Sequence, residues 1–212
     1  MIRKVTLLLG AVISLSLLGA SASWSLPNGL SRNKPYFVDE AKKEIGIYAE
    51  VNGKYLHQPT RHGLNYWQGK YGQMSVFKAY VNQMEIYNAL VKLGVKAGNN
   101  VSLDSPAGAR VQGDAIKVSV GWDGAPREYA VSEVITDSKG KGFEFRFGGN
   151  AKNALEKFTG CMLCLDSCPV GITSNTNYGF QSFANHQVEF KGNQALLPAD
   201  GTPVVVYFRV GR

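Results

Sequence analysis

Several separate segments of this chain carry apolar side chains at every second position, and this pattern restricts its fold more than any other feature. Residues 45–51, 116–120 and 143–147 all show the alternation. Side chains of a strand point alternately to opposite faces, so a period of two predicts strands with one buried face. A composition of 44% hydrophobic and 18% charged residues excludes an intrinsically disordered chain. The pattern therefore predicts a folded domain rich in β-strands.

Turn signals between these segments indicate how the strands connect. Asn52-Gly53 matches a type I′ hairpin turn, so residues 44–51 and 54–57 are predicted to pair as a hairpin. Residues 59–72 are predicted to form a loop. The other strands expected from the pattern are residues 35–38, 116–120, 128–131, 143–147, 188–190 and 204–210.

Two segments carry helix signals instead. Asn82, with Glu85 at the capping-box position and Gly94 at the far end, predicts a helix over residues 83–93. Asn150 is the expected N-cap of a second helix that runs through residue 158. The apolar residues on one face of the first helix are expected to cover a sheet: Ile86, Tyr87, Leu90 and Val91. We therefore expect an α+β fold, a single domain with a mostly antiparallel β-sheet and about two helices.

The N-terminus has the pattern of a cleaved export signal. Arg3 and Lys4 precede an apolar, uncharged stretch, and the small residues Ala20 and Ala22 suit a signal peptidase. We expect residues 1–22 to be a signal peptide and residues 23–212 to be the mature domain, exported to the periplasm or the extracellular space. No apolar run of membrane-spanning length follows, so we expect no integral span after cleavage.

Charge restricts the partners of the mature chain. Removal of Arg3 and Lys4 lowers the formal net charge from +7 to +5. The remaining basic residues are scattered, and no basic helix or arginine-rich arm occurs, so nucleic acid is not an expected partner. The excess positive charge is consistent with a solvated surface, or with weak affinity for an anionic surface.

All three cysteines lie in one short segment, as Cys161, Cys164 and Cys168, and Pro169 follows directly. Such spacing places sulfur atoms close together, as metal ions, clusters and redox disulfides require. The pattern C-x2-C-x3-C-P equals the last part of the bacterial ferredoxin run, whose first ligand would fall at Phe158. The sequence thus indicates a cofactor or cross-linking site at these cysteines.

The residues leave several chemistries open. Two of the cysteines can form a disulfide with one thiol left over, since disulfides persist in oxidising compartments. Three thiolates and a histidine can instead hold zinc, and the possible histidines are His57, His62 and His186. We take His62 as the candidate fourth metal ligand. Inert thiols that only fix a loop are the remaining interpretation.

The chain also resembles the YdjY-type family of exported bacterial proteins, which are described as 4Fe-4S, ferredoxin-like proteins. The resemblance spans residues 33–210. The motifs that carry it are Asn33-Lys34-Pro35, Pro59-Thr60-Arg61-His62-Gly63, Arg146-Phe147-Gly148-Gly149-Asn150, and Thr159-Gly160 leading into residues 161–172. It implies an iron–sulfur cluster bound through Cys161, Cys164 and Cys168.

We therefore expect an exported cysteine-cluster protein that binds an iron–sulfur cluster or another metal and transfers electrons with a redox or protein partner. The alternatives are a thiol–disulfide protein, or a non-catalytic binding or structural module. Zinc, or no cofactor at all, are the alternatives to the cluster. No G-x-S-x-G, H-E-x-x-H or EF-hand motif occurs, so the sequence gives no ground to assign an enzyme activity.

The signal sequence generates the first testable prediction. The secreted protein should begin at Ser23, because Ala20 and Ala22 occupy the positions that the peptidase reads. Intact-mass measurement of secreted protein checks this. A mass that still includes residues 1–22 would contradict it.

Overall fold

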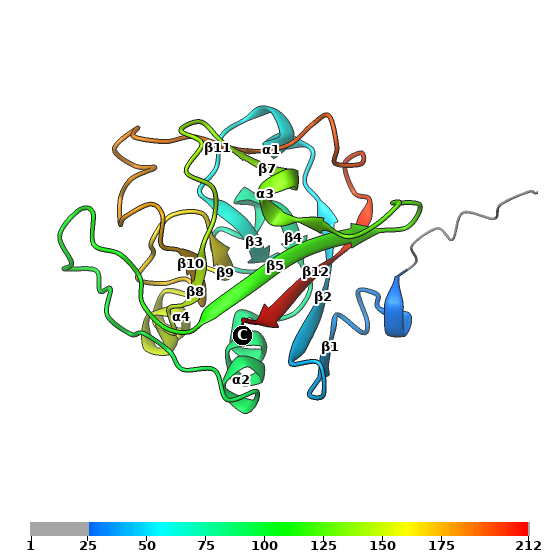
Figure 1. The fold of residues 1–212 in the computed structure, drawn as a ribbon, viewed down its shortest axis with the longest axis horizontal. Helices are drawn as coiled ribbons and strands as arrows, with labels where there is room; N and C mark the ends of the chain where they lie inside the picture. Colours follow the sequence, from blue (N-terminus) through cyan, green and yellow to red (C-terminus); the bar gives the residue numbers. More distant parts are fainter. Residues whose placement is uncertain (1–25, 212) are drawn as a thin grey trace, which may run out of the picture.

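The computed structural model describes residues 26–211, so the predicted signal peptide lies outside the described residues. Strands dominate this part of the chain (Figure 1). In chain order they are β1 (Tyr36–Asp39), β2 (Glu44–Val51), β3 (His62–Tyr66), β4 (Ser75–Ala79), β5 (Ala115–Trp122), β6 (Tyr129–Ala130), β7 (Ile135–Asp137), β8 (Phe145–Phe147), β9 (Cys161–Cys164), β10 (Thr173–Asn175), β11 (Phe190–Gly192) and β12 (Pro203–Val210).

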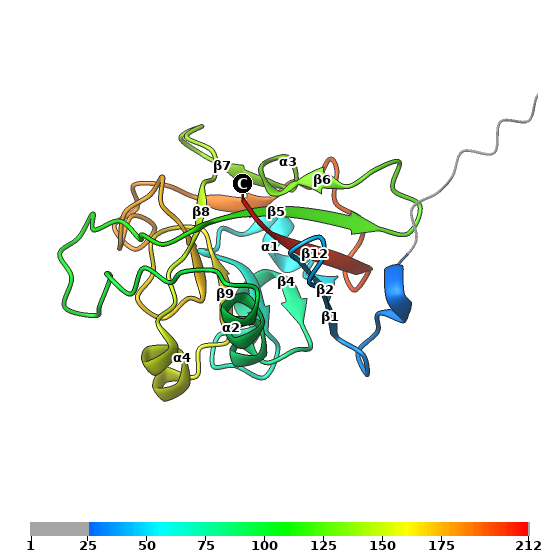
Figure 2. The same ribbon diagram turned by 60° about the horizontal axis from the view of Figure 1, so that its bottom comes forward.

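The helices between these strands are short. They are the 3₁₀ helices η1 (Pro27–Gly29) and η2 (Gly72–Met74) and the α-helices α1 (Lys54–His57), α2 (Gln83–Lys92), α3 (Val131–Val134) and α4 (Ala151–Lys157). Figures 1 and 2 show α2 and α4 together at one end of the molecule, with α3 and the β7–β11 pair toward the other. Among the described residues, no helix is long and apolar enough to cross a membrane.

Eight of the described strands form a closed barrel in the order β2-β12-β5-β8-β10-β9-β3-β4, with β4 paired back onto β2. The pairs β3–β4 and β9–β10 are parallel, and the other pairs in the ring are antiparallel. The predicted fold class, a single α+β domain with a mostly antiparallel sheet and about two helices, is wrong in its architecture. Most pairs of the ring are antiparallel, but the sheet closes into a barrel, and the described chain is mostly β with four short α-helices. Closure of the ring removes the free sheet edges that an open arrangement of these eight strands would expose.

The alternation pattern correctly predicts β2 as a strand, but it does not predict that both faces of this strand are buried. Ile45 and Ile47 point into the main core of the barrel, as predicted. Tyr48, on the other face of β2, packs in a second cluster with Leu30 and Val205. The segment that precedes β1 thus covers the outside of β2, and both faces of this strand are buried.

The predicted hairpin at Asn52-Gly53 is wrong. Gly53 has φ −54° and ψ −28°, which is helical backbone rather than a type I′ turn, and residues 54–57 form α1. The Gly53 amide donates a hydrogen bond of 2.7 Å to Asp200 Oδ1, a partner far away in the sequence. The predicted loop over residues 59–72 is also wrong in part, since it contains β3.

Helix α2 confirms most of its prediction. Asn82 Oδ1 accepts a 2.8 Å hydrogen bond from the amide of Met84, as an N-cap does. Glu85 does not complete a capping box, because its carboxylate accepts a hydrogen bond from the Tyr36 hydroxyl. Leu90 is fully buried, whereas Val91 is 48% exposed and was wrongly assigned to the core face.

This difference between neighbours gives a second prediction. Leu90→Ala should lower the free energy of unfolding by about 2–5 kcal/mol, because it leaves a cavity in the core. Val91→Ala is the matched control. It should change the free energy of unfolding by less than about 0.5 kcal/mol, because most substitutions at exposed positions have effects of that size or smaller. Denaturant melts measure both. Equal losses in the two variants would contradict the placement of α2.

Candidate functional site

The three cysteines of the short segment 161–168 come together in a buried cluster. Cys161 and Cys164 lie on β9 and form a disulfide, and Cys168 follows in the next loop as a free thiol. The three side chains pack against one another, with Val170 beside them. Cys161 and Cys164 are fully buried and Cys168 is 3% exposed. The predicted proximity of the cysteines is therefore confirmed.

Strand geometry alone would not bring Cys161 and Cys164 together. Residues three apart on a regular strand point to opposite faces of the sheet. The pairing of β9 with β3 is irregular, however, with register shifts on both sides of Leu64. Such an irregularity turns side chains from their regular direction. The two sulfurs thus lie together at a place where the regular pairing of β3 with β9 is interrupted.

His62 joins the cluster from β3. It lies opposite Cys164 in the strand register, and its Nδ1 is 3.6 Å from Cys161 Sγ. The possible ligand atoms of His62, Cys161 and Cys164 all lie within 4.8 Å of one another. Tyr71 stacks on the imidazole at 5.6 Å between ring centroids. Burial, with a smaller effect from the nearby charge of Arg61, lowers the pKa of His62 to about 3, so the ring is neutral at neutral pH.

A buried ion pair flanks the cysteines. Arg61 Nε and Nη2 donate to Asp166 Oδ1 at 3.1 and 2.7 Å, and the Phe183 amide donates to Oδ2 at 3.3 Å. Burial raises the pKa of Asp166 above its ordinary value, although Arg61 opposes the shift. Burial also disfavours the charge of Arg61, but Cys168 and Asp166 together raise its pKa. The pair places a guanidinium beside the free thiol.

The loop that carries Cys168 is held from α4. Asn150 Nδ2 donates to the carbonyl oxygens of Cys168 and Gly171, both at 3.0 Å. The structure therefore corrects the predicted role of Asn150, whose side chain makes no helix-capping hydrogen bond. Burial raises the pKa of the Cys168 thiol, while Arg61 partly offsets the shift. The free thiol is thus fixed in place and protonated at neutral pH.

Two residues beyond the cysteines complete the wall around Cys164. A Cβ atom added at Gly171 would lie 2.4 Å from Cys164 Sγ, so this position has room only for glycine. The same added atom would lie 3.3 Å from the hydroxyl oxygen of Ser174, which is buried and has no hydrogen-bond partner among the described residues. An unpartnered buried hydroxyl lowers the stability of the fold, and Ser174 is the residue of β10 that pairs with Cys164.

The sequence identified only part of this site. His57 and His186 are exposed and are not in the group of possible metal ligands. Phe158, at the position of the missing ferredoxin ligand, offers no donor atom and is 41% exposed. The roles of Arg61, Tyr71 and Ser174 were missed. The motif that contains Arg61 and His62 drew attention to their segment, but nothing in the sequence placed it beside the cysteines.

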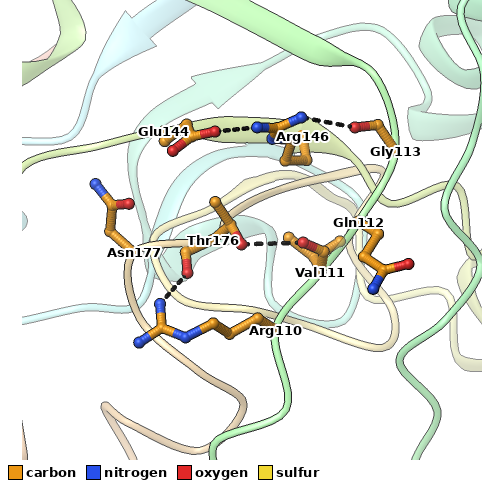
Figure 3. A pocket seen from close by; sticks show the side chains of 8 residues that line it. All are labelled: Arg110, Val111, Gln112, Gly113, Glu144, Arg146, Thr176 and Asn177. Atoms are coloured by element: carbon orange, nitrogen blue, oxygen red, sulfur yellow. Dashed lines mark hydrogen bonds and ion pairs between the residues drawn. The ribbon is translucent and has the colours of Figure 1, made fainter.

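A surface pocket with a volume of about 460 Å³ lies apart from the cysteine cluster (Figure 3). Its polar groups satisfy one another. Arg110 donates to the carbonyl of Thr176, and Arg146 pairs with Glu144. None of its eight labelled lining residues is a cysteine, histidine or aspartate. The cysteine cluster is therefore the better candidate for chemistry.

The buried ion pair generates a third prediction. Asp166→Ala should destabilise the protein by about 3–5 kcal/mol, because it leaves the Arg61 guanidinium buried without its acid. Glu40→Ala removes one partner of the exposed Lys92–Glu40 pair and should cost at most about 1 kcal/mol. Urea melts of the two variants provide the comparison. A loss in Asp166→Ala no larger than that in the control would refute the buried pair.

Comparison with known proteins agrees with the motifs noted in the sequence. The YdjY domain family matches residues 36–209. The chain is also 41% identical, over 184 residues, to the uncharacterized protein YdjY of Escherichia coli (strain K12). That match covers 86% of this chain and 82% of the length of the relative. No solved structure matches. The chain belongs to the YdjY domain family.

Proposed function

We propose that this protein is an exported, redox-dependent metal-binding protein. In the reduced state, Cys161, Cys164 and His62 hold one metal ion, and Cys168, which packs beside them but lies outside this group of ligand atoms, shifts to supply the fourth ligand. In the oxidised state, Cys161 and Cys164 form the disulfide and the ion is lost. The single observation that carries the proposal is the 3.6 Å contact between His62 Nδ1 and Cys161 Sγ inside the buried cysteine cluster.

That distance suits two ligands of one tetrahedral ion. With zinc–sulfur and zinc–nitrogen bonds of about 2.3 and 2.0–2.1 Å, tetrahedral geometry places the two ligand atoms about 3.6 Å apart. A set of three thiolates and one imidazole is also a common zinc ligand set. Zinc is therefore the ion that we propose.

An iron–sulfur cubane suits this arrangement less well. Each protein ligand of a cubane binds a different iron atom, and the cluster itself occupies the space between the ligands. Here the sulfurs pack against one another, and the ligand atoms of His62, Cys161 and Cys164 lie within 4.8 Å. The residues present do not fit the cluster that the family resemblance implied, and we assign it no role.

Burial argues against catalysis of disulfide exchange on other proteins. A catalytic cysteine must be reached by its substrate, and reactive cysteines are partly exposed. Both sulfurs of the disulfide are fully buried. The disulfide itself supports export, since disulfides persist in oxidising compartments. Reduction adds two electrons and two protons from a dithiol or other two-electron reductant, and metal binding then releases thiol protons.

The fourth prediction concerns thiols and metal together. Protein unfolded in air without reductant should yield one alkylated thiol, and reduced protein should yield three. Reduced, refolded protein should bind one zinc ion per chain and then lose thiol reactivity. Alkylation with mass spectrometry counts the thiols, and metal analysis after dialysis counts the zinc.

Variants test each ligand. Cys164→Ser, Cys168→Ser and His62→Gln should each weaken zinc binding by at least about tenfold, since each removes one of four ligands. His57→Gln and His186→Gln are matched controls on exposed histidines and should bind zinc unchanged. Three freely reactive thiols in air, unaffected by zinc, would refute both states of the proposal. Iron and sulfide bound in equal amounts would replace the single ion by a cluster.

A further inference from the structure

A small pocket opens beside the cysteine cluster, with a volume of about 260 Å³. Cys168 forms part of its wall, whereas Cys161 and Cys164 do not line it. Its lining combines cationic and apolar side chains. The cationic ones are Arg61, Lys70 and Lys157, and the apolar ones include Leu103, Val170 and Phe180.

The charges of this pocket are unbalanced. No aspartate or glutamate lines it. Neither Lys70 nor Lys157 forms an ion pair with any residue of the described chain. Arg61 does have an acid, but Asp166 is fully buried and does not line the pocket. A concave site lined by charge of one sign concentrates ligands of the opposite sign.

Arg61 also keeps hydrogen-bonding capacity. A guanidinium has five N–H donors, and Arg61 directs Nε and Nη2 to Asp166. Its Nη1 has no hydrogen-bond partner among the residues that the structure describes. The side chain is only 23% exposed, so this capacity lies largely out of bulk water. A carboxylate is the ligand group that matches a guanidinium best.

The apolar residues of the lining indicate what the remainder of the ligand, beyond its carboxylate, should be. Leu103 is 50% exposed at the pocket although it is a large apolar residue, whereas Phe180 is largely buried. Exposed apolar surface beside convergent polar groups is typical of small-molecule sites. The pocket volume of about 260 Å³ lies just below the usual range of about 300–1,000 Å³, which favours a ligand of few atoms.

We propose that this pocket binds a small organic acid, with its carboxylate at Arg61, Lys70 and Lys157 and its apolar body against Leu103 and Phe180. The bound acid would lie against Cys168. This proposal goes beyond the metal-binding function and does not depend on it, because the pocket is present in the disulfide form of the protein.

Benzoate and benzamide test the proposal in the oxidised protein, since they share a ring and differ in charge. We expect benzoate to shift the amide resonances of residues 157–159, 70–71, 168 and 170 in saturable fashion in two-dimensional NMR spectra. Benzamide should bind at least about tenfold more weakly, because it lacks the charge that strengthens the hydrogen bonds. Equal binding of the two compounds, or no saturable shift, would overturn the proposal.

A pair of double variants tests the residues. Lys70→Gln with Lys157→Gln should weaken benzoate binding at least about tenfold, because it removes two of the three cations. Lys139→Gln with Lys141→Gln makes the same change of charge at a different recess and should leave binding unchanged. Arg61 is left intact in both, since its loss would also break the buried ion pair. Equal weakening by both double variants, or benzoate-induced shifts centred on Lys139 and Lys141, would show that only the overall charge or another recess binds the anion.

Discussion

The antiparallel pairing of β3 with β9 is the contact on which both the barrel and the candidate site depend. It joins segments that are about a hundred residues apart in the sequence and closes one side of the ring. The same pairing sets His62 opposite Cys164 and continues as a hydrogen bond from the Leu165 amide to the Arg61 carbonyl, at 2.9 Å. The imidazole therefore reaches the cysteines from β3, and the guanidinium from the residue directly before this strand.

The cluster places polar groups in a region that the barrel could have filled with apolar side chains. Burying an ion pair often contributes little net stability, because desolvation offsets the attraction between the charges. The Arg61–Asp166 pair is nevertheless well satisfied, with a further backbone donor to the carboxylate. Two other buried polar atoms, the Ser174 hydroxyl and Asn65 Oδ1, have no hydrogen-bond partner in the described chain, and their residues pair with Cys164 and Cys161. The polar groups near the disulfide are therefore satisfied only in part.

The pocket and the site around the cysteines share Arg61, Tyr71, Cys168 and Val170. Arg61 forms the buried ion pair with Asp166 and also lines the pocket. Cys168 is the one of the three cysteines that lines the pocket, and it packs against the other two. A ligand in the pocket would thus contact the wall of the proposed metal site without being part of it.

The sequence by itself determined the local features of this protein. The alternation located β2, β5 and β8, the Asn82 cap located α2, and the short spacing of the cysteines limited how far apart their sulfurs could lie. These features depend on residues a few positions apart, whose geometry the chain itself limits.

Tertiary structure decided the rest. Gly53 adopts helical backbone because its surroundings, including Asp200, override a local turn preference. The closure of the barrel, the parallel pairs and the choice of His62 over His57 depend on strand register between distant segments. Register follows from the packing of the whole core, which no local pattern encodes.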